Sequence, residues 1–295
     1  MKLDRAKGAP RTGAQHLAAQ AYDWRMATPD PAPSDPRARE NEAFWRNYLE
    51  NYKRAQGMAR PFLSRIPSNP RCLLCGSPFH GFGGGLMKMI GKAQSSVNPR
   101  MCNQCENVML KHHGGAEVPC SMLFADVRGS TALAETMSAE EFRNRMDRFY
   151  AAASGAVFAN NGVVDKFVGD EVVAVFAPML GLDHPSRAVA AGLELLRATG
   201  HADPVGPWVP VGAGVHTGQV WFGVVGEGGH VELTVLGDPV NTTARLASQA
   251  GTGELVVSAA AATAAGLDTG LERRSLDLKG KAQATEVVTL RVDGA

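Results

Sequence analysis

The sequence lacks any hydrophobic run long enough to cross a membrane, because its apolar stretches fall well short of the roughly 18 residues that a spanning helix needs. Its first residues, MKLDRAKGAPRTG, are basic but lack the apolar segment of a secretory signal. There is no internal repeat. Five cysteines in 295 residues are too few for a disulfide-stapled miniprotein. With 44% hydrophobic residues, the chain can bury the core of one large or two modest domains, and we expect a cytoplasmic protein without a membrane span.

Net charge is also nearly absent, at +1, but this value conceals an asymmetry. Residues 1–116 carry a net charge of +9 and residues 117–295 carry −8. A change of sign within a chain indicates two units with different roles. The basic half would suit nucleic acid, an anionic membrane surface or the acidic half itself, or it is simply a solvated surface.

Residues 1–66 are expected to form an N-terminal arm with one amphipathic helix. Closely spaced prolines indicate a poorly ordered segment up to residue 36. Asp35-Pro36 then has the pattern of an N-cap followed by proline at the first helical position. The next residues place an apolar stripe on one helical face, which packs on its own protein or on a partner helix: Phe44, Trp45, Tyr48, Leu49 and Tyr52.

Residues 67–116 contain two C-x-x-C pairs, Cys72 with Cys75 and Cys102 with Cys105. Each pair puts two thiolates on one tight turn, and two such turns supply the four ligands of a tetrahedral Zn²⁺. An iron–sulfur cluster uses the same four ligands and stays open as the alternative. The residues after Cys102 have a helical pattern, so the second pair is expected at a helix N-terminus.

Other groups near these pairs have plainer interpretations. His80, His112 and His113 are spare metal ligands or solvated histidines. The fifth cysteine, Cys120, opens an apolar strand and is expected in the core. Modules of this kind often bind nucleic acid. No series of base-stacking aromatic residues or arginine-rich groove accompanies these cysteines, so we do not expect nucleic acid as a partner.

From residue 117 onward, strands alternate with helices and hairpins, which indicates an α+β fold rather than a doubly wound parallel sheet. A helix is expected to begin at the capping box formed by Ser138 and Glu141. The remaining elements are expected as follows: strands near 120–127, 254–257, 271–278 and 285–292, hairpins over 163–176 and over 208–226 with turns at Gly169-Asp170 and Thr217-Gly218, and helices over 138–162, 184–199 and 240–251.

Two carboxylates are expected at neighbouring strand ends. Asp126 follows a buried strand in FADVRGST, and Asp170 lies at the hairpin tip of VVDKFVGDEVVAVF. Carboxylates placed in this way can share a pair of divalent ions such as Mg²⁺, which completes its coordination with phosphates and water. The turn after Asp126 offers backbone N–H groups to a phosphate.

A third segment, TVLGDPVNTTAR, places Asn241 and Arg245 one helical turn apart on the same face. An amide and a guanidinium together suit positioning of a sugar and stabilisation of phosphoryl charge. Near the C-terminal strands, Lys279 in LKGK can meet a polyphosphate, although a lysine pair in a turn is usually solvated.

The ordered set of motifs in residues 117–293 resembles the catalytic domain of class III adenylate and guanylate cyclases: FADVRGST, VVDKFVGDEVVAVF, GAGVHTGQVWFG, TVLGDPVNTTARL and LKGK. The resemblance implies a ferredoxin-like βαββαβ domain behind the arm (1–66) and the four-cysteine module (67–116). It implies two Mg²⁺ or Mn²⁺ ions per site. The implied roles are metal binding for Asp126, Asp170 and the Val127 carbonyl, base recognition for Lys166 and Thr234, ribose positioning for Asn241, transition-state stabilisation for Arg245 and triphosphate binding for Lys279. His216 in GVHTG is interpreted as structural.

Thr234 stands where many family members have aspartate and a subset has threonine. A guanine-specific site would be expected to have glutamate and a cysteine-like residue in place of Lys166 and Thr234, so the pair favours ATP. The resemblance therefore implies an adenylate cyclase that makes 3′,5′-cyclic AMP and pyrophosphate in a homodimer with two shared sites. The alternatives are a guanylate cyclase, or a nucleic-acid-binding protein that uses the cyclase fold to dimerise.

Overall fold

The computed structural model describes residues 36–50, 63, 66, 71–72, 75–96, 101–226, 232–267, 269–278 and 284–292. The chain divides into two compact units, Met1–Arg39 and Glu40–Ala295. Among the described residues, no helix combines the length and apolarity needed to cross a bilayer. The arm expected before Pro36, the side chain of Tyr52 and Lys279 lie outside the described residues.

The helices are α1 (Pro36–Glu50), α4 (Gly81–Met89), α5 (Asn103–Lys111), α6 (Ser130–Glu135), α7 (Ala139–Ala159), η2 (Pro178–Leu180), α8 (His184–Ala198), α9 (Asp238–Gln249) and α10 (Ala259–Ala264). The strands are β1 (Gly114–Val127), β2 (Val163–Val168), β3 (Glu171–Phe176), β4 (Val211–Val225), β5 (Glu232–Leu236), β6 (Leu255–Ser258), β7 (Arg273–Leu276) and β8 (Thr285–Leu290).

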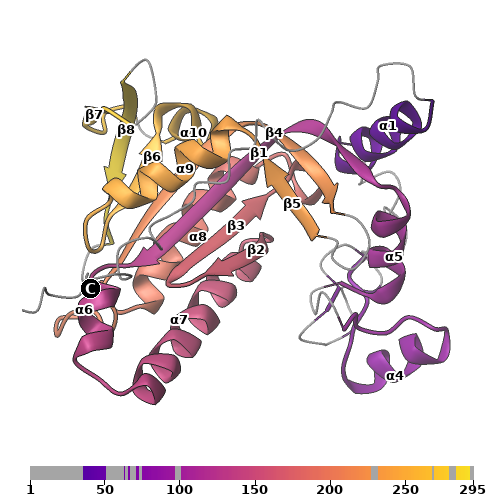
Figure 1. Ribbon diagram of the computed structural model, residues 1–295, viewed down its shortest axis with the longest axis horizontal. Helices are drawn as coiled ribbons and strands as arrows, with labels where there is room; N and C mark the ends of the chain where they lie inside the picture. Colours follow the sequence, from indigo (N-terminus) through magenta and orange to yellow (C-terminus); the bar gives the residue numbers. More distant parts are fainter. Residues whose placement is uncertain are drawn as a thin grey trace, which may run out of the picture. The chain divides into compact units, whose positions relative to one another are not determined.

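The strands form one mixed sheet in the order β2-β3-β1-β4-β6-β8-β7, with β5 paired to β4 (Figure 1). β2, β3, β1 and β4 pair antiparallel to one another, whereas β4 pairs in parallel with β6, and α7 and α8 connect the first four strands in the order βαββαβ. The predicted α+β, ferredoxin-like architecture is therefore confirmed. The arrangement puts the ends of β1 and the β2–β3 hairpin, which carry the predicted carboxylates, side by side.

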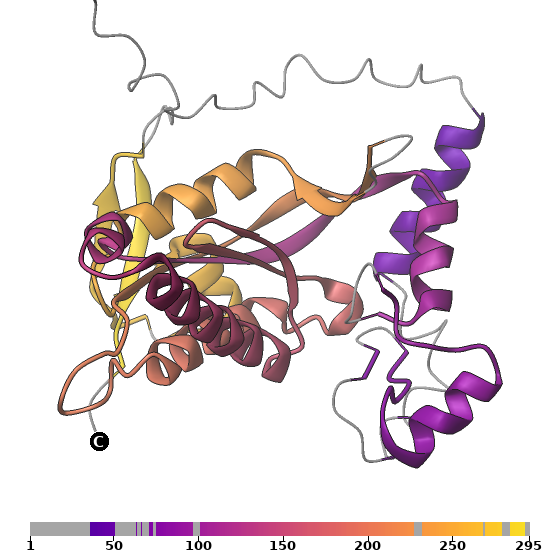
Figure 2. The same ribbon diagram turned by 60° about the horizontal axis from the view of Figure 1, so that its bottom comes forward.

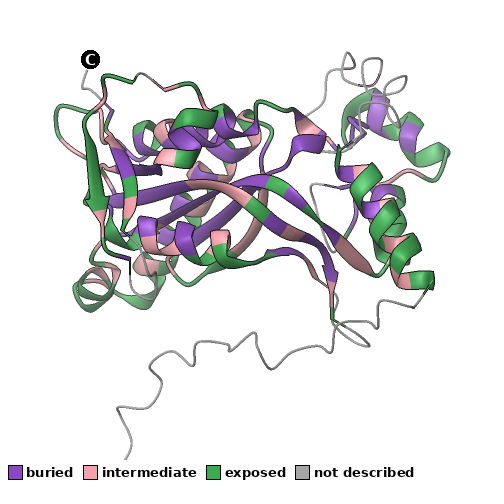
Figure 3. Cartoon of the chain, turned by 90° about the horizontal axis from the view of Figure 1, so that it is seen from above, coloured by how far each residue is buried: buried purple, intermediate pink, exposed green. Residues whose placement is uncertain are grey.

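Both faces of the sheet are buried, as the alternation of side chains along β1 shows. Leu123 and Ala125 join a core with α7, α8 and α10. Met122 and Phe124 point to the other face and join a core that includes α9. Because successive strand residues point to opposite faces, one apolar run serves both layers, and Figure 2 shows α7 and α9 on opposite sides of the sheet. Figure 3 shows the buried residues following the central strands.

Helix α7 begins as its sequence predicts. The Ser138 side chain accepts a hydrogen bond from the Glu141 backbone N–H, and the Glu141 side chain accepts one from the Ser138 backbone N–H. Two of the donors that every helix N-terminus leaves free are thereby satisfied. The helix then carries Phe149 and Val157 into the core without exposure.

The predicted turn at Thr217-Gly218 is wrong. Residues 211–225 form one continuous strand, β4, which pairs with β1 from Val127↔Val211 to Gly114↔Val224. Gly218 serves packing instead of a turn: a Cβ at this position would lie 2.8 Å from Pro239 at the start of α9. β1 likewise begins at Gly114, earlier than the expected strand at 120–127.

Helix α1 packs on its own chain, as the plainer interpretation of its apolar stripe predicts. Trp45 and Leu49 are fully buried. The Trp45 indole N–H donates to the His112 carbonyl oxygen at 2.7 Å. The Phe44 ring stacks on the His112 ring with centroids 3.6 Å apart. These contacts tie α1 to the end of α5, next to the start of β1.

The buried His184 makes stability depend on pH. Its Nδ1 lies 2.9 Å from Ser121 Oγ, and burial, reinforced by Arg187 and opposed by Asp183, lowers its pKa to about 4. An unfolded histidine has a pKa of about 6.5, so the unfolded state binds more protons between these values and stability is lost as pH falls through this window. We expect the wild-type protein to lose about 2 kcal/mol more unfolding free energy than His184→Asn between pH 7.5 and pH 5.

Urea unfolding at the two pH values measures this difference. His113→Asn, which removes an exposed histidine, is the matched control and should follow the wild type. An identical pH dependence for His184→Asn and wild type would contradict the assignment.

Candidate active site and metal-binding cysteines

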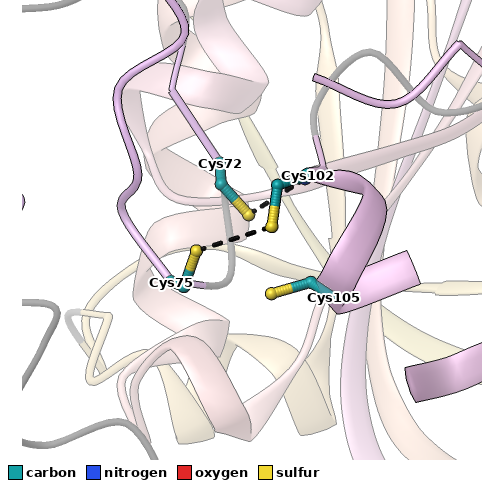
Figure 4. A group of neighbouring side chains, drawn as sticks. All are labelled: Cys72, Cys75, Cys102 and Cys105. Carbon is teal, nitrogen blue, oxygen red and sulfur yellow. Dashed lines mark hydrogen bonds between the residues drawn. The ribbon is translucent and has the colours of Figure 1, made fainter. Parts of the chain in front are cut away.

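The four predicted cysteine ligands meet in one buried cluster (Figure 4). Their sulfur atoms all lie within 4.8 Å of one another, and Cys75 Sγ is 3.8 Å from Cys102 Sγ. Four sulfurs placed tetrahedrally at about 2.3 Å from a zinc ion would be about 3.8 Å apart. The donor set and spacing therefore fit a metal centre with four cysteine ligands. His80, His112 and His113 are not members of this group among the residues that the structure describes.

Backbone hydrogen bonds shape the two cysteine turns. In the first, Gly76 N–H donates to the Cys72 carbonyl at 2.8 Å, and Gly76 has a φ of 72°, which favours glycine. In the second, Cys102 is the N-cap of α5, as its sequence predicts, and Cys105 lies in the first turn of that helix. The Cys102 N–H also donates to Cys72 Sγ at 3.3 Å, which joins the two turns.

The two predicted carboxylates come together at one edge of the sheet. Asp126 is the penultimate residue of β1, and Asp170 lies in the β2–β3 turn beside it. The Val127 N–H donates to the Asp170 carbonyl oxygen at 3.2 Å, which fixes the two segments to each other. Gly169 has a φ of 61°, a conformation that glycine adopts without strain. The turn therefore presents Asp170 next to the end of β1.

Electrostatics at this edge favour a cation. Burial raises the pKa of Asp126 to about 6; Arg128 opposes this shift and Asp170 adds to it. Glu171, whose Cα pairs with that of Asp126, has its pKa raised to about 7 by burial and by the same two aspartates. Arg128 Nη2 lies 2.8 Å from Asp126 Oδ1. Carboxylates crowded in this way suit Mg²⁺, which prefers oxygen ligands.

Lys166 and Thr234 meet around another acidic residue, Asp165. The Thr234 hydroxyl donates to Asp165 Oδ2 at 3.1 Å, and Lys166 Nζ lies 3.6 Å from the same oxygen. Lys166 Nζ is also 2.7 Å from Glu232 Oε1. Thr234 is buried, whereas the Lys166 side chain remains 36% exposed. The two residues predicted to read the base therefore face one position from different strands.

Helix α9 carries Asn241 and Arg245 one turn apart, as predicted. Asn241 is exposed and Arg245 is partly exposed, so both side chains are accessible to a ligand. His216 Nδ1 lies 2.7 Å from Ser258 Oγ, in agreement with the structural role expected for it. Cys120 is fully buried in β1, as expected of a core residue.

Sequence reasoning missed three acidic residues of these sites: Asp165, Glu171 and Glu232. One signal was present for Asp165, because an Asp-Lys pair inside the otherwise apolar run VVDKFV requires partners for both charges. Glu171 follows Asp170 directly, but its role depends on the pairing register. Glu232 lies in β5, which was not expected as a strand.

Comparison with protein-family models matches residues 115–290 to the adenylate and guanylate cyclase catalytic domain. Among curated proteins, the uncharacterized protein Rv1319c of Mycobacterium tuberculosis H37Rv is 34% identical over 178 residues, which is 60% of this chain and 32% of that protein. The uncharacterized protein Rv1320c of the same strain is 37% identical over 136 residues, 45% of this chain and 23% of the relative. This chain thus spans about a third or less of the length of these relatives.

Solved structures share the same fold. The crystal structure of the guanylyl cyclase Cya2 has a TM-score of 0.55 and 27% identity, and the match covers 60% of this chain and 93% of that chain. The catalytic core of a rhodopsin-guanylyl cyclase with converted specificity, in complex with ATPalphaS, has a TM-score of 0.52 and 20% identity, covering 60% and 97% of the two chains. At this lower identity, the likeness concerns the fold alone.

Proposed function

Since the chain belongs to the adenylate and guanylate cyclase catalytic domain family, whose class III members use divalent metals, we propose that it is an adenylate cyclase that converts ATP to 3′,5′-cyclic AMP and pyrophosphate. The observation that carries the choice of ATP is the pairing of Lys166 and Thr234 around Asp165 Oδ2. Lysine donates hydrogen bonds and a threonine hydroxyl accepts them, which suits the ring nitrogen N1 and the 6-amino group of adenine.

Each residue of the site has a role in this proposal. Asp126, Asp170 and the Val127 carbonyl would hold two Mg²⁺ or Mn²⁺ ions. These ions would supply the charge that acidifies the ribose 3′-hydroxyl and binds the phosphates. Asn241 positions the ribose. Arg245 stabilises the charge that develops on the α-phosphate as the 3′-oxygen attacks and pyrophosphate leaves. Lys279, outside the described residues, is proposed to bind the triphosphate.

We propose that two copies of the chain assemble each site, because class III cyclase domains usually act as dimers. One protomer supplies Asp126 and Asp170, and its partner supplies Lys166, Thr234, Asn241 and Arg245. The strands that carry Lys166 and Thr234 also expose large apolar side chains, Phe167 (45%), Val168 (53%) and Leu236 (49%). Such a patch is typical of a surface that a second subunit covers.

The cysteine cluster is proposed to bind one structural Zn²⁺, with an iron–sulfur cluster as the alternative. The four buried sulfurs lie within 4.8 Å of one another, with 3.8 Å between Cys75 Sγ and Cys102 Sγ, which supports a metal over disulfides. Because α5 leads directly from Cys105 to β1, the metal would fix the segment that enters the catalytic sheet.

A guanylate cyclase is the second candidate, and two observations favour it. Cya2, with 27% identity, is a guanylyl cyclase. In addition, the Glu232 carboxylate next to Lys166 offers acceptors that the guanine N1–H and 2-amino groups would need. The proposal for ATP therefore requires a direct test.

We expect purified protein with Mg²⁺ or Mn²⁺ to form cyclic AMP from ATP and little cyclic GMP from GTP, with products identified by mass spectrometry. Lys166→Met should lower kcat/KM for ATP roughly 10- to 100-fold, because a hydrogen bond from a charged group contributes about 1.5–3 kcal/mol. Lys111→Met removes an exposed lysine of α5 and should leave turnover unchanged. Formation of cyclic GMP from GTP in preference to cyclic AMP from ATP would support the second candidate instead.

A further inference from the structure

Asp165 occupies an irregular position in β2. The β2–β3 ladder pairs Val164 with Ala174 and then Lys166 with Val173, so Asp165 has no partner in the ladder. This is the pattern of a β-bulge, in which one strand contains an extra residue. In a regular strand, successive side chains point to opposite faces. Here the side chains of Asp165 and Lys166 meet, with 3.6 Å between Oδ2 and Nζ.

The bulge brings a buried carboxylate to the residue that is proposed to read the 6-position of the base. The Asp165 side chain is only 6% exposed. Its Oδ2 accepts the hydrogen bond of the Thr234 hydroxyl at 3.1 Å. A bulge in this place redirects a side chain, which is a common use of bulges near active sites.

The direction of this hydrogen bond decides what Thr234 can offer a ligand. An ionised carboxylate only accepts hydrogen bonds, and a hydroxyl has one proton and two lone pairs. Because Thr234 gives its proton to Asp165, its remaining hydrogen-bonding capacity is that of an acceptor. The 6-amino group of adenine donates to such an acceptor. The 6-oxo group of guanine or hypoxanthine is itself an acceptor, so its lone pairs would face those of the Thr234 hydroxyl and no hydrogen bond would form.

We propose that Asp165 is a positioning residue for base specificity, because it fixes the Thr234 hydroxyl as an acceptor and so selects purines with a 6-amino group over those with a 6-oxo group. This inference rests on the proposed adenylate cyclase function. It assigns to Asp165 no contact with substrate. Asp165 acts through Thr234, while its charge, together with that of Glu232, also helps to hold the Lys166 ammonium group.

The ionisation of Asp165 supplies an independent readout. Burial raises its pKa to about 6, Lys166 and the Thr234 hydrogen bond oppose this shift, and Glu232 adds to it. Above this pH the carboxylate can only accept. Below it, the carboxylic acid can donate to Thr234, which frees the threonine proton for a 6-oxo group.

The test compares kcat/KM for ATP, inosine triphosphate and purine riboside triphosphate. Inosine triphosphate has a 6-oxo group in place of the 6-amino group and lacks the 2-amino group of GTP. Purine riboside triphosphate has only hydrogen at the 6-position. We expect Asp165→Ala to lower the ATP preference over inosine triphosphate on the order of tenfold. The ATP preference over purine riboside triphosphate should fall as well. In a Thr234→Val background, Asp165→Ala should change neither ratio further, because the two residues act as a unit.

If Asp165→Ala fails to fold, Asp165→Asn replaces it in the test, because asparagine has nearly the same shape as aspartate. In the wild type, the ATP preference over inosine triphosphate should decline as pH falls below about 6, and in Asp165→Asn it should not change between pH 5.5 and 8. Equal losses of kcat/KM for all three nucleotides, with unchanged ratios, would overturn the role of Asp165. A wild-type protein that does not prefer ATP would overturn the proposed function itself, so the two failures are distinguishable.

Discussion

Asp126→Ala and Arg245→Ala are each expected to lower turnover on the order of a hundred- to a thousandfold, and a mixture of the two variants is expected to regain about a quarter of the wild-type rate. Asp126 belongs to the metal-binding half of the proposed site, and Arg245 to the half supplied by the partner. A heterodimer of the two variants contains one site with both defects and one site with neither. When subunits mix at random, half of the dimers are of this kind.

The control for this experiment mixes Asp126→Ala with Asp170→Ala. Both changes lie in the same half of the site, so every site of that heterodimer lacks one carboxylate and no activity should return. Subunits are exchanged by unfolding and refolding together, and two different affinity tags confirm that heterodimers form. If heterodimers of Asp126→Ala and Arg245→Ala form but stay inactive, each site is built within one protomer and the proposed arrangement is wrong.

The second large effect concerns the cysteine cluster. Cys72→Ser together with Cys75→Ser removes half of the cysteine ligands, and we expect the protein to lose the metal proposed for the cluster and the fold of the described residues between Arg71 and His113. Structural zinc binds with an apparent free energy of about 10–16 kcal/mol in small modules, and this is also folding free energy. Elemental analysis measures the metal, the visible absorption spectrum separates zinc from an iron–sulfur cluster, and limited proteolysis reports unfolding of the module.

Cys120→Ala is the matched control, because Cys120 is buried in β1 and lies outside the cluster. It should keep the metal content of the wild type. The link between the module and catalysis is tested in the same samples by size-exclusion chromatography and turnover. Normal dimerisation and turnover in the double variant would show that the metal does not support the catalytic sheet.

Local patterns predicted the parts of the structure that depend on neighbouring residues. The capping box at Ser138, the helix that begins after Cys102 and the strand end at Asp126 are each determined by a few adjacent side chains. The cysteine cluster was predictable because the ligand spacing is itself the constraint. For the catalytic residues, the ordered motifs carried the prediction, and their roles remain proposals.

The features that the sequence did not disclose depend on contacts between distant segments. The pair Thr217-Gly218 is typical of a turn in sequence. In the structure, Gly218 pairs with β1 and packs against Pro239, and these contacts keep it in a strand. The bulge at Asp165 depends on the register between β2 and β3. Thr234 lies 69 positions from Asp165 along the chain, and no local pattern indicates that they share a hydrogen bond.

The length of β1 has a consequence for the order in which the protein folds. The strand leaves the cysteine module at Gly114 and runs without a break to Val127, but its two neighbours, β3 and β4, end only at Phe176 and Val225. All four cysteines have been synthesised once the ribosome reaches residue 105. We therefore expect the cysteine module to fold first through local contacts. The central strand β1 would remain unpaired at both edges until β3 and β4 have been synthesised. Such distant pairings form slowly and expose strand edges in the meantime.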